Sequence, residues 1–469
     1  MKRKKFFITT AIDYTNDIVH VGHAYQKILA DAIARYHREK GDGVHFLTGT
    51  DEHGQKVAKS AKKKDLSPKE YVDKIAAADK DEWDCLNISY DRFIRTTDPD
   101  HKKLVKKFWQ KVKANGDIYL DEYQGLYCEG CEAFMEETDL VDGRCPFHQQ
   151  QKPIQLKEKN YFFRLSKYQP FLEKQLKIKG FVFPESKRKE ALSFVERGLK
   201  DFSISRHLDW GIPVPDDPKQ TIYVWFDALL NYLTYGEQKK CWPADIHVLG
   251  KDNLRFHAIY WPAMLKSAEY PLPKTIIAHD FLSLNGKKVS KSLGNIIQPS
   301  ELVKQFGVDA IRYYFLRFGP LQNDVDISTN KIKEVYNADL ANGLGNVVAR
   351  IAKLAENHNL EFESDYTKTS LSTDVGQAIE KHDINNALKL IWQALSRIDN
   401  YINQERPWES ASKAKKTLEQ LITKGEAINT IREIACLLRP FLPQTAAKIE
   451  EQFKGPKVKA QKPLFPRLT

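Results

Sequence analysis

The amino-acid sequence predicts an α/β fold: a parallel sheet, a segment inserted into it, and an all-helical C-terminal part. Three observations support this prediction. Near the start of the chain a β-type run, a helical pattern and a second β-type run follow one another, which is the order of a parallel β-α-β unit. Residues from about 116 to 220 lose this alternation and hold a cluster of cysteines. From about residue 330 the apolar spacing is helical almost to the end.

The expected elements divide the chain into four segments. Residues 1–115 and 221–330 form the two halves of a Rossmann-type sheet domain, residues 116–220 form the insertion, and residues 331–469 form the helical domain. Sheets of this type bind ligands at the C-terminal ends of their strands. Strands are expected at residues 6–10, 44–47, 223–226, 246–250 and 275–278, and helices at 23–40, 335–354, 375–403 and 418–438.

The composition is that of a globular chain without membrane-spanning segments. The 469 residues are 42% apolar and 29% charged, with a mean hydropathy of -0.53. No apolar run approaches the roughly 20 residues that cross a bilayer, and the basic start of the chain lacks the apolar core of a signal peptide. We therefore expect a cytoplasmic protein with no membrane contact. The net charge of +11 favours polyanionic partners such as nucleic acid, although a lysine-rich composition alone also produces it.

The first motif is His20-Val21-Gly22-His23, which lies between the first expected strand and the first expected helix. Gly22 lets a phosphate approach the backbone closely, and a helix N-terminus favours anions. Two imidazoles at this place have N–H groups that can donate to phosphate oxygens. By itself the motif is weak, because paired histidines near a helix start are commonly structural.

The second motif is residues 287–292, KKVSKS, followed by Leu293-Gly294-Asn295. A loop of lysines interleaved with serines has the form of a mobile segment that binds polyanions. Most lysine-rich loops, however, are solvated surface. Each motif alone is therefore weak evidence for phosphate binding, and the two together are stronger evidence.

Together they resemble the HIGH and KMSKS signatures of class I aminoacyl-tRNA synthetases, in the family's order along the chain. The resemblance is closest to the methionine-specific branch, the methionyl-tRNA synthetases, and covers essentially the whole chain. It implies a methionine–tRNA ligase that forms methionyl-adenylate from L-methionine and ATP with Mg²⁺, then charges initiator and elongator tRNA(Met). The similar segments are residues 48–54 (TGTDEHG), 224–232 (VWFDALLNY), 257–265 (HAIYWPAML), Tyr401-Ile402-Asn403 and Pro407-Trp408.

The resemblance also implies roles for individual residues. Asp51 would hold the α-amino group of methionine, although a carboxylate at this place can equally be a helix N-cap. Asn346 and Arg350 share a helix face and, with Trp408, match the family's anticodon readers, although packing alone would also explain Trp408. The implied catalytic residues are His20, His23, Lys288 and Lys291; those for ATP are His20, His23, Gly250, Asp252, Val289, Ser290 and Lys291; those for methionine are Ile12, Tyr14, Asp51, Trp225, Ala228, Tyr232, Asn253 and His257.

The cysteine cluster predicts a structural zinc site. Cys128 and Cys131 form one Cys-x2-Cys knuckle, and Cys145 with His148 forms a second. Three thiolates and an imidazole complete a closed tetrahedral set, so we expect one zinc per chain with no open position for catalysis. Only six cysteines occur in the chain, which makes unrelated thiols at this spacing a weak alternative.

Some positions depart from the family pattern. The family usually has Pro or Tyr where Asp13 stands, an aliphatic residue where Asn253 stands, Gly where Asp280 stands, and Met where Val289 stands. A buried amide needs a hydrogen-bond partner, so we expect the Asp13 carboxylate to accept from the Asn253 amide.

Three alternative functions compete with this interpretation. Another class I synthetase is possible, but the segment between His23 and Lys288 is too short for the large editing domain of the isoleucine, valine and leucine enzymes. A cysteine enzyme would need zinc ligands at its substrate. A degenerate paralogue that only holds tRNA is disfavoured by the intact histidines and lysines of both signatures. A simple nucleotidyltransferase would not need the helical domain. We expect a monomer.

Overall fold

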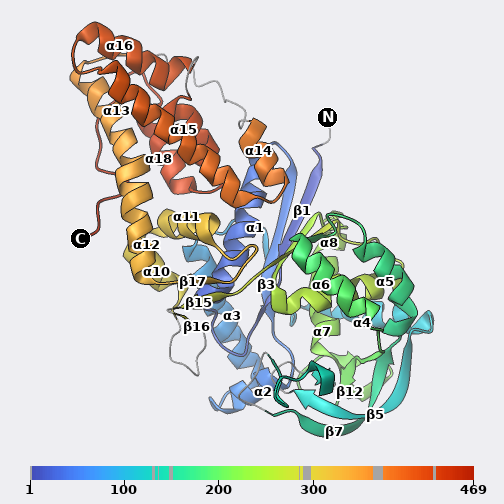
Figure 1. The fold of residues 1–469 in the computed structure, drawn as a ribbon. Helices are drawn as coiled ribbons and strands as arrows, with labels where there is room; N and C mark the ends of the chain where they lie inside the picture. The colour runs from blue at the N-terminus through green and yellow to red at the C-terminus, as the bar shows by residue number, and fades with distance from the viewer. Residues whose placement is uncertain are drawn as a thin grey trace.

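A seven-stranded parallel sheet is the central element of the part of the chain that the computed structural model describes (Figure 1). The order is β2-β3-β1-β13-β14-β8, with β4 also paired to β3. From β1 the chain moves to one side of the sheet, and from β13 it moves to the other. The order therefore reverses between β1 and β13, which is the place where α/β sheets bind ligands. The described residues are 3–128, 133–135, 137–146, 152–284, 286–288, 297–362, 373–425 and 429–469.

The strands of this sheet confirm the predicted α/β class. The predicted strands near residues 6–10, 44–47, 246–250 and 275–278 all occur, somewhat longer than expected at β3. Most of their residues are buried, except at the N-terminal ends of β1, β3 and β14, as expected for strands of a sheet covered on both faces. The bounds are β1 Lys5–Thr10, β2 Asp13–Tyr14, β3 Gly43–Asp51, β4 Arg92–Arg95, β8 Val182–Phe183, β13 Ile246–Gly250 and β14 Thr275–His279.

Helices cover both faces of the sheet. On one face α1 (Val21–Glu39) and α11 (Val308–Phe318) pack in a core that continues into the C-terminal helices. On the other face a second core joins α4 (Pro99–Ala114) and α8 (Asn231–Gln238) to the inserted segment. Further helices before residue 320 are α2 Gln55–Lys62, α3 Pro68–Cys85, α9 Trp261–Ser267 and α10 Pro299–Phe306.

The segment predicted as an insertion forms small antiparallel sheets, and it also gives β8 to the main sheet. Its long hairpin pairs β5 with β7 over ten residue pairs. The four expected segment boundaries stay a prediction. The elements are β5 Ile118–Cys128, β6 Ala133–Met135, β7 Ile154–Phe163, α5 Gln169–Leu176, α6 Glu185–Glu196, β9 Phe202–Ser203, β10 Ser205–Arg206, β11 Pro213–Val214 and β12 Asp217–Ile222.

The predicted strand at residues 223–226 is wrong, because these residues begin a short helix, α7 (Val224–Ala228). Its four apolar residues are too few for periodicity to separate a strand from a buried helical turn. Tertiary packing decides the outcome: Trp225 lies flat on Phe256, with ring centroids 3.6 Å apart. The strand of this region, β12, ends one residue earlier at Ile222, before the helix cap at Tyr223.

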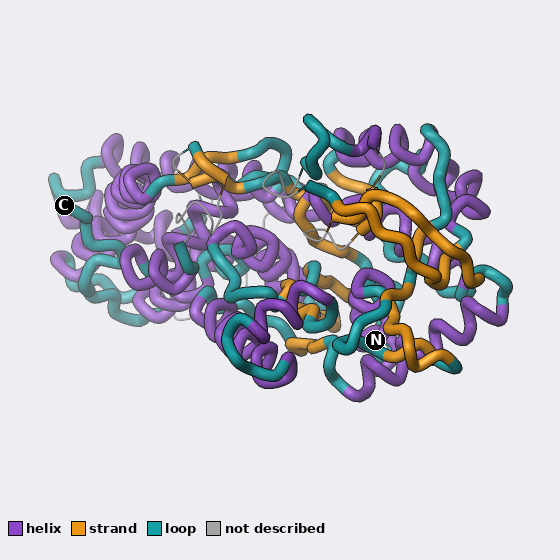
Figure 2. Tube along the Cα trace, turned by 90° about the horizontal axis from the view of Figure 1, so that it is seen from below, coloured by secondary structure: helices purple, strands orange, loops and turns teal. Residues whose placement is uncertain are grey.

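The C-terminal part is predominantly helical, as predicted, and occupies one end of an elongated molecule (Figure 2). Two of the long helices that periodicity predicts are broken. Asp383 caps a new helix within 375–403, and Gly425, at a φ of 62°, ends a helical run within 418–438. The elements are α12 Thr329–Val335, the π-helical turn η6 Tyr336–Gly345, α13 Asn346–Asn357, α14 Thr373–Glu380, α15 Ile384–Glu405, α16 Ala411–Glu419, η7 Gln420–Lys424, α17 Ile431–Leu438 and α18 Pro443–Phe453.

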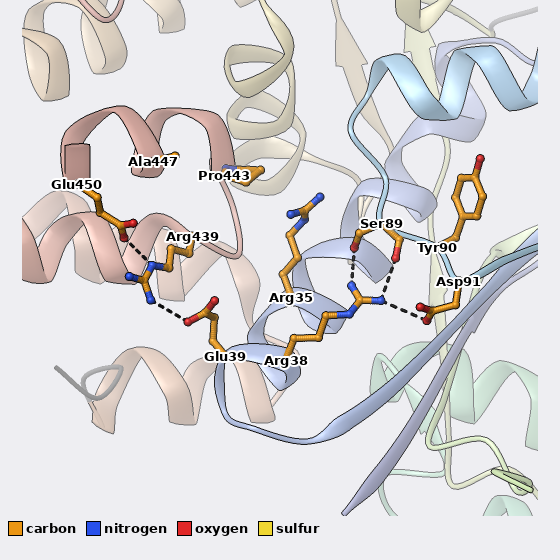
Figure 3. A pocket seen from close by; sticks show the side chains of 10 residues that line it. All are labelled: Arg35, Arg38, Glu39, Ser89, Tyr90, Asp91, Arg439, Pro443, Ala447 and Glu450. Carbon is orange, nitrogen blue, oxygen red and sulfur yellow. Dashed lines mark hydrogen bonds and ion pairs between the residues drawn. The ribbon is translucent and has the colours of Figure 1, made fainter. Parts of the chain in front are cut away.

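Polar contacts along the second half of α1 attach the helical part to the sheet. Arg312 is fully buried, pairs with Asp31 at 2.7 Å and donates to the Phe441 carbonyl oxygen at 2.9 Å. Nearby, Arg439 pairs with Glu39 and Glu450 beside a cavity of about 520 Å³ (Figure 3). The arginines around this cavity are paired with acids or bound to carbonyls, so it is charge-balanced. None of the described helices is both long and apolar enough to span a membrane.

Candidate active site

The two histidines of the first motif cap helix α1 reciprocally. His20 is the N-cap residue, and its Nδ1 accepts from the Gly22 N–H at 3.1 Å. In return, the Nδ1 of His23 accepts from the His20 N–H at 3.2 Å. A Cβ on residue 22 would lie 2.8 Å from the His20 ring, so only glycine lets the ring fold back onto the helix end. This cap stands just beyond the C-terminal end of β1.

The cap also decides where each imidazole carries its proton. A ring nitrogen that accepts from a backbone N–H is unprotonated, so the proton of each neutral ring is at Nε2. Burial and then the Lys27 ammonium lower the pKa of His23 to about 4, and its ring is therefore neutral at pH 7. The motif thus offers two neutral N–H donors at a helix N-terminus, which suits phosphate oxygens.

Gly250 ends β13 and faces the same edge of the sheet. A Cβ there would lie 2.7 Å from Asp252 Oδ1, so the Asp252 side chain folds back closely over Gly250 at the turn into the short helix η3 (Lys251–Asn253). Asp252 is exposed on that turn. Gly250 and Asp252 therefore lie next to β1, on the opposite side from β3, as a nucleotide site at the switch point requires.

Tyr232, His257 and Asn253 form one hydrogen-bonded chain. The His257 Nδ1 lies 2.9 Å from the Asn253 carbonyl oxygen, which only accepts, so Nδ1 carries the proton. The Tyr232 hydroxyl therefore donates to His257 Nε2 at 2.7 Å. Burial lowers the pKa of His257 to about 4, which keeps the ring neutral. These polar groups satisfy one another, and the wall they form is chemically suited to an apolar thioether.

The remaining predicted methionine residues lie on the flanking elements. His257 is on a π-helical turn, η4 (Phe256–Tyr260), a feature frequent at functional sites. Trp225 stacks on Phe256, and Ala228 is buried at the end of α7. On the other side, β2 pairs with β3 so that Tyr14 stands opposite Asp51. Ile12 is partly buried between β1 and β2 and packs on the second core.

Asp227 holds these two sides together, although the sequence motifs alone assign it no role. Its carboxylate binds His53 Nδ1 at 2.6 Å and His101 Nε2 at 2.7 Å, and all three groups are buried. Burial alone would raise the pKa of Asp227, but the two histidines lower it, so the carboxylate is charged. His53 follows Asp51 in TGTDEHG, and Asp227 lies in VWFDALLNY. Their presence in the two most specific motifs was the available signal.

The expected bond between Asp13 and Asn253 is wrong. Asp13 is buried and its Oδ2 pairs with Lys27 Nζ at 2.9 Å, while Trp83 Nε1 donates to the same oxygen at 3.2 Å. Asn253 meets the site through its backbone carbonyl instead. The partner of Asp13 is on a helix that periodicity marks as a core face, where a lysine is unexpected.

Asp280, the departure at a family glycine, is also in an ion pair. Its Oδ1 lies 2.8 Å from Lys187 Nζ on α6 and 3.1 Å from Lys251 Nζ beside Gly250. The carboxylate is nearly buried, and these two ammonium groups compensate its charge.

Only the start of the second signature lies within the described residues. Lys288 is on β16 (Lys287–Lys288), which pairs with β15 (Leu282–Leu284), and β15 pairs with β17 (Val325–Ile327). The predicted residues Val289, Ser290 and Lys291 lie outside the described residues.

Comparisons with known proteins decide the family. A family model described as tRNA synthetases class I (M) matches residues 6–155 and 137–352. The methionine–tRNA ligase of Caldanaerobacter subterraneus is 42% identical over 99% of this chain and 79% of its own length. That of Bacillus subtilis is 40% identical over 99% of this chain and 78% of its own length. The chain belongs to the methionyl-tRNA synthetase family.

A solved structure of that family agrees in fold over the whole chain. Mycobacterium tuberculosis methionyl-tRNA synthetase in complex with methionyl-adenylate superposes with a TM-score of 0.90 at 38% identity, covering 99% of this chain and 100% of that one. The apo form of the same enzyme gives a TM-score of 0.83. The sheet, the insertion and the helical part thus form a methionyl-tRNA synthetase fold.

Two of the four predicted zinc ligands lie within the described residues. Cys128 ends β5, and Cys145 follows a turn closed by the Val141–Arg144 bridge. Both thiols are buried, which fits a closed structural site. Cys131 and His148 lie outside the described residues, and the described ones alone bring no three metal-binding side chains together. The zinc site stays a prediction.

The predicted anticodon residues of this synthetase fold lie on α13 and beyond α15. Asn346 is exposed at the start of α13, and Arg350, one turn later, pairs with Asp399 and donates to Asn403 Oδ1 at 2.8 Å. Trp408 follows α15 in a turn with 54% of its surface exposed. Core packing therefore does not explain Trp408.

Proposed function

We propose that this chain is a methionine–tRNA ligase: it activates L-methionine with ATP and transfers the methionyl group to the 3′ end of tRNA(Met). The observation that carries the proposal is the reciprocal cap of His20 and His23, next to the neutral wall of Tyr232 and His257, at the switch point of the sheet. Membership of the methionyl-tRNA synthetase family supports it.

In the first step a carboxylate oxygen of methionine attacks the α-phosphorus of ATP. The bond between the α-phosphorus and the bridging oxygen breaks, and pyrophosphate leaves with that electron pair. No covalent bond to the protein forms. Catalysis is then positioning and stabilisation of charge on the phosphates, to which Mg²⁺ bound with ATP contributes.

Both signatures act on the phosphates. The Nε2–H groups of His20 and His23 donate to phosphate oxygens, and the ammonium groups of Lys288 and Lys291 neutralise the leaving pyrophosphate. Gly250 and Asp252 hold the adenosine, with Asp252 on the ribose hydroxyls. Val289 and Ser290 complete the nucleotide site.

Methionine is held by its charge and by its side chain. Asp51 at the end of β3 pairs with the substrate ammonium. The methionine side chain is surrounded by Ile12, Tyr14, Trp225, Ala228, Tyr232, Asn253 and His257. Because Tyr232 donates to His257 and His257 donates to the Asn253 carbonyl, this wall demands no hydrogen bond from the substrate. A site of this kind accepts a thioether without leaving buried donors unpaired.

In the second step the 3′ ribose hydroxyl of tRNA attacks the methionyl carbonyl carbon, and AMP leaves. The helical part reads the anticodon of initiator and elongator tRNA(Met) alike: exposed Trp408 stacks on an unpaired base, and Asn346 with Arg350 binds base edges. The net charge of +11 favours this partner.

A zinc ion held by Cys128, Cys131, Cys145 and His148 would stabilise the tip of the insertion without taking part in the reaction. Metal analysis of protein purified without chelator should find about one zinc per chain, lost in Cys145→Ser. Metal-free protein would contradict the assignment.

We also propose that the chain acts as a cytoplasmic monomer.

Pyrophosphate exchange with a panel of amino acids tests the proposed function. We expect labelled pyrophosphate to enter ATP in the presence of methionine, and not with cysteine, leucine, isoleucine or valine. Charging of tRNA(Met) should likewise occur with methionine and not with the other four amino acids. Exchange with another amino acid would indicate a different class I synthetase, and tRNA binding without any exchange would indicate a degenerate paralogue.

A further inference from the structure

A fully buried lysine lies directly beneath the proposed active site. Lys27 is on α1, one turn after His23, and its side chain has no exposed surface. Its ammonium donates to the Ala11 carbonyl oxygen at 2.7 Å and to Thr10 Oγ1 at 3.0 Å, and it pairs with Asp13 Oδ2 at 2.9 Å. One side chain thus ties the C-terminal end of β1 to the first turns of α1.

Asp13 extends this link to two more elements. It lies on β2, directly after Ile12, and receives the Trp83 indole N–H from α3 as well as the Gln26 amide at 3.4 Å. On the same helix α3, Asp79 accepts from the Val19 N–H at 2.8 Å, which fixes the backbone one residue before His20. The cluster therefore surrounds the segment from Thr10 to His23 on its buried side.

The energetics of such a pair argue against a purely stabilising role. Replacing a buried ion pair by apolar residues of similar volume is often neutral or stabilising, because the charges are costly to remove from water. Removing one partner alone is strongly destabilising. Burial raises the pKa of Asp13 and lowers that of Lys27, and the opposite charge of each partner opposes these shifts. Beyond apolar packing, the pair adds five hydrogen bonds and ion pairs that fix the relative orientation of the elements they join.

Resting on the proposed function, we infer that Asp13 and Lys27 are positioning residues for methionine activation. They lock the turn between β1 and β2, which carries Ile12, against the helix turn that presents His20 and His23. The Nε2–H donor of His23 and the side chain of Ile12 are thereby held at a fixed position relative to each other. A small misplacement of such groups weakens the transition state more than substrate binding.

The test separates positioning from stability by replacing both charges at once. In Asp13→Leu with Lys27→Met the core stays filled and no charge is stranded, so we expect a melting temperature close to the parent's. The kcat of methionine-dependent pyrophosphate exchange should fall by about tenfold to a hundredfold, the range expected when catalytic groups shift by up to 1 Å. The KM values for methionine and ATP should stay near the parent's.

The chain offers a matched control on the same helix. Asp31 and Arg312 are equally buried and 2.7 Å apart, but this pair faces the C-terminal helices rather than the active site. Asp31→Asn should lower the melting temperature and leave the kcat of the folded protein unchanged. An equal loss of kcat in this control would overturn the inference, because any weakened core would then have the same effect.

Parent-like kcat in the double variant would also overturn the inference. If the double variant does not fold, the isosteric Asp13→Asn decides: a reduced kcat at unchanged KM supports positioning, and parent-like kinetics contradicts it. Absence of methionine-dependent exchange in the parent itself would instead overturn the proposed function, which is a separate result.

Discussion

The two proposed binding regions differ in how their side chains are held before a ligand binds. At the sheet edge His20 and His23 cap one helix together, and Tyr232 donates to His257. At the far end of the helical part, Trp408 leaves 54% of its surface in solvent. A small substrate is best served by groups whose geometry is fixed before it arrives. An RNA base brings its own stacking face, so the protein needs only to keep an aromatic surface open.

Removing a fixed donor at the sheet edge should have the largest effect. His23→Ala deletes an Nε2–H donor and the cap of the His20 N–H, so methionine-dependent pyrophosphate exchange should slow by roughly 10²-fold or more. Binding of tRNA(Met), measured by filter retention, should remain at the parent's level. Near-normal exchange in this variant would show that His23 has no catalytic role. The proposal that fixed donors at the sheet serve the small substrate would then fail.

At the open end, Trp408→Ala should affect tRNA alone. The loss of one stacked base corresponds to roughly 1–3 kcal/mol in kcat/KM for tRNA(Met). Exchange without tRNA should be unchanged, because the side chain is exposed and supports no core. Trp392, which is partly buried and stacks on Tyr313 at 4.3 Å, is the matched control, and Trp392→Ala should lower the melting temperature. A joint loss of exchange and charging in Trp408→Ala would show that Trp408 is structural.

A smaller change tests the hydrogen-bonded wall of the proposed methionine pocket. Tyr232→Phe keeps the ring but leaves His257 Nε2 buried without a donor, at a cost of about 1–3 kcal/mol. Part of this cost should appear as a weaker kcat/KM for methionine at an unchanged KM for ATP. Tyr235→Phe, one turn along the same helix and equally buried, should leave both constants unchanged. Equal kinetics for the two variants would mean that the Tyr232 hydroxyl does not shape the pocket.

The sequence predicted what depends on local patterns and motifs, and it missed what depends on contacts between distant segments. The strands near residues 6–10 and 246–250 follow from short apolar runs, and the helix at His23 follows from its spacing. At Trp225 the apolar run is too short to show a period, so the sequence pattern predicts a strand where the structure has a helix.

The partners of buried charges show the same limit. Asp13 is buried against Lys27 and Trp83, on two helices that meet only in the folded chain. No spacing rule connects these three positions, so the sequence indicated only that Asp13 needs a partner. His53 and Asp227 were similarly visible as members of two motifs, but their contact, 174 residues apart in the chain, was not.

The smallest effect concerns the acid sensitivity of the sheet edge. Burial lowers the pKa of His23, His257 and His279 to about 4, against an ordinary value of about 6.5 in the unfolded chain. Between these values an unfolded histidine binds a proton and a folded one does not. The stability from each neutral ring is therefore complete above pH 6.5 and is lost as the pH falls toward 4.

Asp79 acts in the opposite sense, which is why single variants are needed. Burial and then Asp13 raise its pKa to about 8, so its contribution is complete below the unfolded value of 3.8 and is lost as the pH rises toward 8. Melting curves between pH 7.5 and 4.5 should show that His279→Gln loses less stability on acidification than the parent, and that Asp79→Asn loses more. Parallel curves for all three proteins would mean that these groups titrate alike in the folded and unfolded chain. The side chains at the sheet edge would then be accessible to water, and they would no longer differ in burial from the exposed Trp408.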